Sequence, residues 1–402
     1  MLELTDKQRD IQGKARELAK EFATRAAQHD ADRSAPVENF ARLREAGFHD
    51  LVIPEKLGGG GGGMFEWTLA VEELAQGCAA TTMAFNMHIS ATGMITRTEV
   101  MGLNKTVRLK VAEQVCEGAL LCASATEPGS SSRDLTNILP TMPAEPDGNG
   151  GYILNGRKAF VSNVESCDYM LVYVRPTDAI AIDDCVSILV PTNSEGMSVI
   201  DVWDTHGMRA TRSNQVNYEQ VAVSADNVLD RRPGLFFDAL TQGGLYFAHG
   251  FTATYLGLGL GMLNWAIEYL GGRVNKLVTQ PMSYHPDARR RIGELATLLE
   301  TARMQVRAVS WLGDRKVDDA LIHQMWLAKA AMGIALAKAS ESLPVICGAS
   351  SLFKNQPLGR MLRDAATANI MPPSYDALLD MIGSAEMQLD PTQIQPALTP
   401  KT

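Results

Sequence analysis

The spacing of apolar residues changes twice along this chain, and that change limits the folds open to it. Before about residue 120 and after about residue 230, apolar side chains recur every three or four residues, the period of an amphipathic helix. Between these points they come in short runs rich in β-branched side chains, which are typical of strands. The runs lie at 152–154, 169–174, 185–191 and 197–203. The chain therefore reads as helices, then a β domain, then helices.

We accordingly divide the 402 residues into four parts. Residues 1–119 are expected to form an N-terminal all-α domain, 120–229 a middle β domain, 230–385 a C-terminal helical bundle, and 386–402 a loose tail. The fold class is α+β, mainly α. Turn residues at regular intervals favour an antiparallel barrel or sandwich in the middle, and long apolar stripes favour a four-helix bundle at the C-terminal end.

Local signals add detail. Thr5 and Gln8 form a capping-box pattern at the start of the first helix. The pair Asn155-Gly156 between two apolar runs predicts a hairpin. The six glycines at 58–63 either form a loop between helices or cradle a phosphate. We favour the loop, because no Lys-Ser/Thr ending follows the run and no strand-and-helix unit surrounds it.

Bulk properties exclude several classes of function. The formal charge is −9, and no basic block stands out, so nucleic acid is not an expected partner. The six cysteines are scattered without metal-ligand spacing, which indicates reduced thiols in a cytoplasmic protein and no metal site. No charged residue occurs between Asp238 and Glu268. That stretch is long enough to span a membrane, but its glycines and polar residues favour a helix buried in the bundle.

Four motifs in order give the chain a resemblance to the acyl-CoA dehydrogenase superfamily. The segment TEPGSSSRD at 126–134 is similar to the family's TEPGxGSD, and NGRKAFVSN at 155–163 to its NGxKxWITN. The segment GMRATRS at 207–213 is similar to the GxRxSxT turn, and RMLRDA at 360–365 to the arginine-aspartate signature. The resemblance covers residues 1 to about 385 and implies an acyl-CoA dehydrogenase-like fold.

The resemblance implies an FAD cofactor and seven residues that bind it. Hydroxyl groups would bond the edge of the isoalloxazine ring, an aromatic side chain would pack on its face, and a glycine pair would admit the adenosine of a neighbouring subunit's cofactor. The alternative for each hydroxyl is an ordinary turn or strand role, and for the aromatic residue an ordinary core role. The implied residues are Thr126 and Ser162 at the ring edge, Phe160 on its face, Ser132 at the phosphates, Gly348 and Ala349 at the adenosine, and Ser374.

The chain departs from the family where the catalytic base is expected. The family's glutamate position falls on Pro372, and an alternative site for the base falls near Phe251; neither residue can remove a proton. The family's FAD-binding arginine near 275–276 is also not evident. Three residues could supply proton chemistry instead: Asp376, His249 and His88. The alternatives are that Asp376 merely begins a helix and that each histidine is a hydrogen-bonded core residue.

Three functions follow from the resemblance. The first is oxidation of an acyl thioester, either acyl-CoA or carrier-bound, with hydride transfer to the flavin and electrons passed to a flavoprotein acceptor. The second is a flavin-dependent monooxygenase that uses dioxygen, in which Ser162 and His88 would act at the flavin. The third is a catalytically silent scaffold homologue. We expect a homodimer or homotetramer with no membrane partner.

Overall fold

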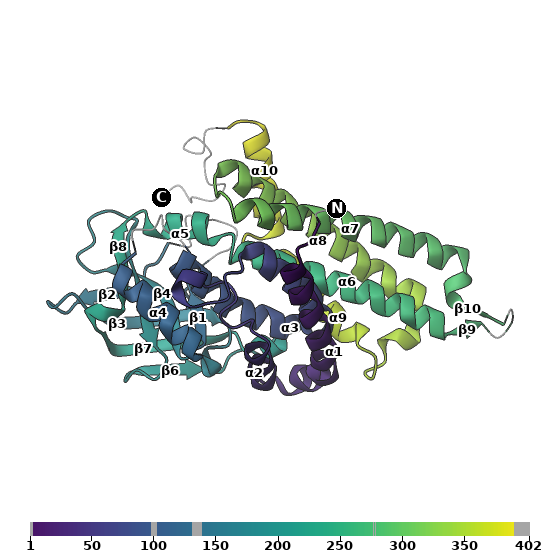
Figure 1. Cartoon of the computed structure of the whole chain (residues 1–402), viewed down its shortest axis with the longest axis horizontal. Helices are drawn as coiled ribbons and strands as arrows, with labels where there is room; N and C mark the ends of the chain where they lie inside the picture. The colour runs from purple at the N-terminus through teal and green to yellow at the C-terminus, as the bar shows by residue number, and fades with distance from the viewer. Residues whose placement is uncertain (1–2, 98–102, 131–138, 276, 278, 390–402) are drawn as a thin grey trace, which may run out of the picture.

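The fold has three parts in the predicted order. A computed structural model describes residues 3–97, 103–130, 139–275, 277 and 279–389 of the chain. Figure 1 shows the sheet at one side of the molecule, the N-terminal helices across the middle, and the long C-terminal helices extending from the other side. The α+β class, mainly α, is confirmed.

Four helices form the N-terminal part. They are α1 (Asp6–Asp32), α2 (Val37–Glu45), α3 (Met64–Arg97) and α4 (Lys105–Glu117). The predicted capping box is present: the Thr5 hydroxyl accepts a hydrogen bond from the Gln8 N–H, and the Gln8 side chain accepts one from the Thr5 N–H. The third helix is buried along almost its whole length, so it forms the centre of the molecule.

The middle part is an eight-stranded sheet. Its strands are β1 (Leu121–Ser124), β2 (Pro143–Pro146), β3 (Tyr152–Val161), β4 (Tyr169–Pro176), β5 (Asp184–Pro191), β6 (Met197–Ile200), β7 (Asn214–Val223) and β8 (Val228–Pro233). The order is β6-β7-β3-β2-β4-β5-β8, with β1 paired to β4. Most neighbours are antiparallel, but β1 and β2 run parallel to β4, so the sheet is mixed rather than wholly antiparallel.

The hairpin predicted at Asn155-Gly156 is wrong. Both residues lie inside β3, which continues past them and pairs with β7. The pairing register shifts between Leu154 and Gly156, and Gly156 has a φ of 135°. The Asn155 side chain accepts a hydrogen bond of 2.9 Å from the N–H of Gln220 on β7. The glycine therefore serves a bulge within a long strand, which needs the same backbone freedom as a turn.

The C-terminal part is a helical bundle. It contains α5 (Leu235–Gly243), α6 (Ala248–Gly272), α7 (Pro286–Gly313), α8 (Asp319–Cys347), α9 (Leu358–Ala365) and α10 (Tyr375–Glu386), with the short strands β9 (Val274–Asn275) and β10 (Gln280–Pro281) after α6. The apolar stripes expected on α7 and α8 are buried. By length and composition one described helix, α8, could cross a membrane, but half of that window is buried within the protein.

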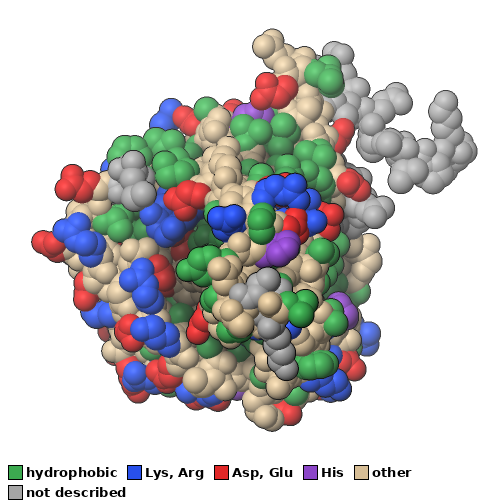
Figure 2. Space-filling view, turned by 90° about the vertical axis from the view of Figure 1, so that its right-hand side faces the viewer, with side chains coloured by type: hydrophobic (Ala, Val, Ile, Leu, Met, Phe, Trp, Pro, Cys, Tyr) green, Lys and Arg blue, Asp and Glu red, His purple; other side chains and the backbone are tan. Residues whose placement is uncertain are grey.

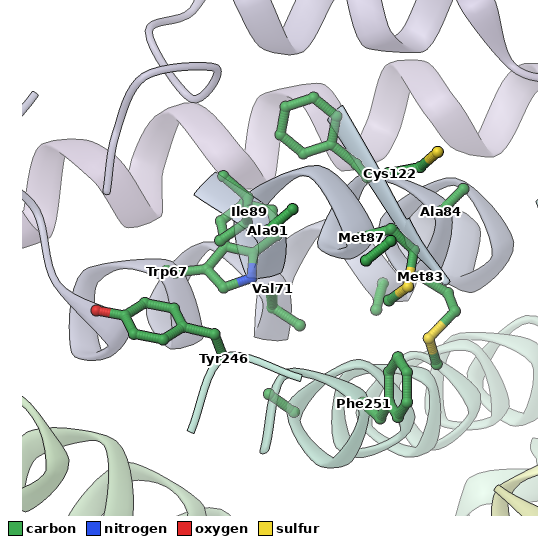
Figure 3. Packing of buried hydrophobic residues seen from close by; sticks show 14 of the residues in the cluster. Trp67, Val71, Met83, Ala84, Met87, Ile89, Ala91, Cys122, Tyr246 and Phe251 are labelled. Carbon is green, nitrogen blue, oxygen red and sulfur yellow. The ribbon is translucent and has the colours of Figure 1, made fainter. Parts of the chain in front are cut away.

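The uncharged stretch of residues 239–267 is two helices, not one. The chain turns between α5 and α6, where the N–H groups of Tyr246 and Phe247 bond to the carbonyl of Gly243. Figure 3 shows Tyr246 and Phe251 directed toward α3. Glycines allow close approach of α6 and α3, because a Cβ on Gly250 would lie 2.2 Å from the side-chain oxygen of Asn86.

The glycine run at 58–63 is a loop between helices, as favoured from the sequence. Arg97 donates to the carbonyls of Val52 and Gly62 at 2.7 and 2.8 Å and so fixes the loop. The Asp314 carboxylate, at the end of α7, accepts the N–H groups of Met64 and Phe65 at 2.7 and 2.8 Å. The N–H groups at the start of α3 that could hold a phosphate are therefore bonded to an anion of the chain itself.

Candidate active site

Three of the predicted cofactor-binding residues lie together beside the middle sheet. Thr126 follows β1, Phe160 lies near the end of β3, and Ser162 follows that strand. The two segments are joined by a hydrogen bond of 2.9 Å from the N–H of Ala159 to the carbonyl of Thr126. The half-buried Thr126 hydroxyl makes no hydrogen bond with the residues that the structure describes. Ser132, expected at the phosphates, lies outside the described residues.

Phe160 is unusual in both backbone and exposure. Its φ is 55°, a region that an aromatic residue rarely adopts, and the pairing of β3 with β7 shifts register between Lys158 and Val161. Its side chain is 62% exposed and meets Trp203 edge-on, with ring centroids 6.1 Å apart. Such a strained position that exposes a large ring is typical of a ligand contact. It fits the apolar wall that a flavin ring needs.

A chain of hydroxyl groups continues inward from Ser162. The Ser162 Oγ lies 2.7 Å from the Ser213 Oγ, which lies 2.8 Å from the Thr211 Oγ1. Thr211 donates to the carbonyl of Met208 at 2.9 Å, and the indole N–H of Trp203 donates to the same oxygen at 2.9 Å. One turn thus supports both Phe160 and Ser162. Ser213 and Thr211 were not predicted individually, although both lie in the 207–213 motif.

The arginine-aspartate signature holds this turn against the bundle. Asp364 is buried, and its carboxylate accepts the N–H of Met208 at 2.6 Å. Burial raises the pKa of Asp364 above its ordinary value. Arg363 pairs with Asp30 on α1. A Cβ on Gly207 would lie 2.0 Å from the carbonyl oxygen of Arg363, so the turn packs directly on α9.

A buried ion pair fixes the loop that carries Thr126. Glu127 and Lys158 are 2.7 Å apart, and Lys158 is wholly buried. The Glu127 carboxylate also accepts the N–H groups of Thr141 and Met142 at 3.0 and 2.9 Å. Burial alone would raise the pKa of Glu127, but Lys158 and the hydrogen bonds outweigh burial, and the pKa lies below its ordinary value. The Glu127–Lys158 pair is therefore part of the scaffold.

The segment at 371–376 contains Pro372, the residue on which the sequence resemblance placed the family's base. Lys329 of α8 donates to the carbonyls of Met371 and Pro373, each at 2.7 Å, and burial lowers the pKa of Lys329 to about 7. The Ser374 hydroxyl is buried without a hydrogen-bond partner in the described part of the chain. Asp376 is exposed in the first turn of α10. An unpaired buried hydroxyl requires a partner, and a bound cofactor or substrate would supply one.

His249 lies inside the bundle. Its side chain is fully buried, and Nε2 lies 3.0 Å from the carbonyl oxygen of Val306 on α7, to which it donates. Its Nδ1 is buried without a partner among the described residues. Burial lowers the pKa of His249 to about 4. His249 is therefore neutral near pH 7, with its Nε2 directed toward α7.

The assignment of His88 to the flavin is corrected by the structure. Its ring is fully buried on α3 and stacks on His49, with ring centroids 4.3 Å apart. Nδ1 accepts the N–H of Leu121 at 3.1 Å, and Nε2 donates to the carbonyl of His49 at 2.7 Å. Burial holds the pKa of His88 well below its ordinary value. Both ring nitrogens are bonded to backbone, so His88 is a neutral core residue that joins α3 to the sheet.

Gly348 and Ala349 lie just beyond the C-terminal end of α8. Gly348 follows α8 with a φ of 76°, and Ala349 begins the next turn with an exposed side chain. This end of α8 is about 27 Å along the helix from Lys329. Sequence reasoning missed Arg273, whose guanidinium donates to the carbonyl of Cys347 at 2.7 Å and so lies beside the pair. The one sequence signal for Arg273 was its position just before residues 275–276, where the family's FAD-binding arginine was expected.

A wide cleft lies elsewhere in the described chain. A cleft of about 1580 Å³ runs between α1, α6 and the segment at 352–363, and none of the predicted site residues lines it. Figure 2 views the molecule from the end at which α6 stops, where hydrophobic side chains lie between charged ones. Val274, Tyr284 and Phe353 are each more than half exposed in the described chain. The cleft belongs to the N-terminal helices and the bundle, not to the Phe160 site.

Three family models match the chain in order. The acyl-CoA dehydrogenase N-terminal domain matches residues 5–98, the middle domain residues 122–221, and the C-terminal domain residues 249–371. Together they cover well over half of the chain. The matched regions follow the helical, sheet and helical parts of the fold.

Individual relatives span several activities. A 3-sulfinopropanoyl-CoA desulfinase of Advenella mimigardefordensis is 26% identical over 98% of this chain and 97% of its own. A dibenzothiophene monooxygenase of Mycolicibacterium goodii is 29% identical over 74% of this chain and 72% of its own. Among solved structures, FMN-bound TdsC of Paenibacillus sp. A11-2 superposes with a TM-score of 0.83 at 24% identity, covering 94% and 97% of the two chains. The chain belongs to the acyl-CoA dehydrogenase family and is a flavin-dependent oxidoreductase.

Proposed function

We propose that this enzyme oxidises an acyl thioester, either acyl-CoA or a carrier-bound acyl group, and that the ligand lies between the middle sheet and the bundle. The observation that carries the proposal is the exposed Phe160 ring beside the hydroxyls of Thr126 and Ser162. A flat apolar wall with hydrogen-bonding groups at its edge suits an isoalloxazine ring. When bound, the flavin supplies a hydride acceptor.

The protein groups have separate tasks in this proposal. Phe160 covers one face of the ring and excludes water from it. Thr126, Ser162 and the unpaired hydroxyl of Ser374 fix the position of the cofactor and substrate by hydrogen bonds. Lys329 holds the backbone on both sides of Pro372 and thereby fixes Ser374.

Proton removal from the substrate falls to Asp376 in this proposal. By the resemblance, the two positions of the family's base fall on Pro372 and near Phe251, and neither residue has an ionisable group. Asp376 is exposed and lies two residues past Ser374 in the first turn of α10. His249 is not carried forward, because its Nε2 is directed toward α7 and bonded to the carbonyl of Val306.

We propose FAD rather than FMN as the natural flavin. FMN ends at one phosphate, whereas FAD extends to an adenosine that needs a second binding region. Gly348 and Ala349 offer backbone without bulky side chains, but they lie about 27 Å along α8 from the Ser374 region. In a dimer this region would serve the cofactor of the partner subunit. A flavoprotein electron acceptor would then reoxidise the cofactor.

A second candidate is a flavin-dependent monooxygenase. The lack of a carboxylate at both family base positions favours it, because reaction of a reduced flavin with dioxygen requires no α-proton removal from the substrate. The 29% identical relative named as a dibenzothiophene monooxygenase supports it as well. On this route Ser162, rather than His88, is the polar group at the flavin.

Anaerobic reduction separates the candidates. Flavin-loaded protein is mixed, without oxygen, with acyl-CoA thioesters of short, medium and long chains. Loss of the visible flavin absorption is the expected result and would identify the chain length accepted. No bleaching with any thioester, together with dioxygen consumption after addition of an external flavin reductant and an aromatic substrate, would support the monooxygenase. No response in either assay would favour a catalytically silent scaffold.

A further inference from the structure

The hydroxyl groups of Ser162, Ser213 and Thr211 form a continuous hydrogen-bonded row that runs inward from Ser162. The oxygen–oxygen distances are 2.7 Å from Ser162 to Ser213 and 2.8 Å from Ser213 to Thr211. Ser213 and Thr211 are buried, at 5% and 2% exposure, so water does not compete for these bonds. The row ends on the carbonyl oxygen of Met208, 2.9 Å from the Thr211 Oγ1.

A count of protons gives the direction of this row for the arrangement in which Thr211 donates to Met208. Each hydroxyl has one proton to donate. Thr211 donates its proton to Met208, so the bond to Ser213 must use the proton of Ser213. Ser213 then has none left, so Ser162 donates inward to Ser213. In this arrangement the Ser162 oxygen presents only lone pairs to its outer side.

The row has one alternative arrangement. If all three hydroxyls rotate, Thr211 donates to Ser213, Ser213 donates to Ser162, and Ser162 donates outward. The Met208 carbonyl then loses Thr211 but keeps the indole N–H of Trp203 at 2.9 Å. The reversal therefore costs one hydrogen bond and breaks no covalent bond. Such a cost changes an equilibrium by up to about tenfold, which corresponds to about 1.4 kcal/mol.

We propose that Ser213 and Thr211 are positioning residues that bias Ser162 toward the reduced flavin. The proposal rests on the proposed placement of the flavin edge at Ser162. The N5 atom of an oxidised flavin accepts a hydrogen bond, whereas N5 of the reduced flavin carries a proton and donates one. The favoured direction of the row makes Ser162 an acceptor and so suits the reduced state. Binding of the oxidised state requires the reversed row.

The test compares binding of the two redox states of flavin without any substrate. Dissociation constants for oxidised and chemically reduced flavin are measured anaerobically for the wild type and for Ser213→Ala. Removal of the Ser213 hydroxyl frees Ser162 to donate or accept without bias. We expect the preference for reduced over oxidised flavin to fall by about two- to tenfold, with a matching decrease in the midpoint potential.

Controls separate the row from general damage. Ser213→Thr keeps the hydroxyl and should show the wild-type ratio of the two dissociation constants. Thr211→Val removes the hydroxyl at the inner end of the row and should lower the preference for reduced flavin as Ser213→Ala does. Thr205→Val removes a hydroxyl that bonds only to Gly207 and should leave the ratio unchanged. An unchanged ratio in folded, flavin-binding Ser213→Ala and Thr211→Val would overturn the proposal. A wild type that binds neither redox state of flavin would also overturn the proposal. Failure of thioester oxidation alone would leave the proposal intact.

Discussion

Asp376 is the residue on which the proposed proton removal depends. Asp376→Asn keeps the shape of the side chain but removes its basicity. We expect thioester oxidation to slow by about 100-fold, while flavin affinity is unchanged because the hydroxyls and Phe160 remain. Stopped-flow measurement of flavin reduction provides the rate.

Asp380→Asn is the matched control for this variant, because Asp380 is exposed one turn later on α10. Equal reduction rates for Asp376→Asn and the wild type would exclude Asp376 as the base. The same result in an enzyme that consumes dioxygen would point to the monooxygenase.

His249 provides a second test at the residue scale, of stability and not of catalysis. The folded protein binds its proton only below about pH 4, whereas the unfolded chain binds it below about pH 6.5. The unfolded state therefore gains protons first as the pH falls, and the free energy of unfolding decreases between pH 6.5 and 4. We expect the loss attributable to His249 to be about 3 kcal/mol.

Urea titrations at several pH values check this, with His249→Gln compared against the wild type. The difference in unfolding free energy between them should shrink or change sign toward pH 4, because the variant cannot take up this proton. His323→Gln is a control, since His323 is partly exposed and pairs with Glu386 on the surface. A pH-independent difference for His249→Gln would contradict the buried neutral state.

The structure brings three of the predicted cofactor-binding residues together, and their role in binding flavin stays a prediction. Thr126, Phe160 and Ser162 come together because the N–H of Ala159 on β3 bonds to the carbonyl of Thr126, although β1 itself pairs with β4. His88 was assigned differently because a sequence does not reveal that Leu121 and His49 would bond both its nitrogens. Arg273 and Lys329 were missed for the same reason: their partners lie 40 or more residues away in the chain.

At the scale of elements, α8 provides the platform for the segment that would carry the base. The ammonium group of Lys329 is buried, and burial lowers its pKa to about 7. Between about pH 7 and 10.4 the unfolded chain binds the lysine proton and the folded protein does not. The free energy of unfolding should therefore rise with pH across this window, by about 2–4 kcal/mol.

Lys329→Met removes that titration, so the wild type should gain stability relative to the variant as the pH rises from 7 to 10. Denaturant titrations across this range provide the measurement. Lys338→Met is the control on the same helix, because Lys338 forms a surface pair with Glu341. Parallel pH profiles of the wild type and Lys329→Met would show that Lys329 keeps an ordinary pKa.

Elements were predictable to different degrees for physical reasons. The capping box at Thr5 and the stripes on α7 and α8 are local signals, and the structure confirms them. Asn155-Gly156 failed because a bulge and a hairpin both need a residue with positive φ. The break between α5 and α6 was missed because Gly243 and Gly244 are compatible with both a helix and a turn.

At the scale of the whole molecule, the length of α8 separates two groups of predicted cofactor residues. The Ser374 region lies near Lys329, and Gly348 lies about 27 Å further along the helix. The described chain also exposes Val274, Tyr284 and Phe353 at the end of the bundle. Both observations favour an assembly in which the second region meets a partner subunit. We therefore expect light scattering to give a multiple of the 43.6 kDa chain mass.

The choice of flavin and the assembly can be tested with one substitution. Gly348 has a φ of 76°, so Gly348→Ala strains the backbone beside the proposed adenosine site, although a Cβ there meets nothing closer than Arg273 at 3.8 Å. We expect FAD affinity to fall by about tenfold or more while FMN affinity is unchanged, because FMN does not extend to this region. Gly359→Ala, at an open site, is the control.

Fluorescence titration with each flavin, followed by light scattering of the same samples, distinguishes the outcomes. If Gly348 serves the adenosine of a partner's cofactor, the loss is confined to FAD, and it occurs only while the assembly persists. Equal losses for FAD and FMN would mean that the substitution acts through general destabilisation. A flavin-loaded wild type that remains a 43.6 kDa monomer would exclude a partner's cofactor at Gly348.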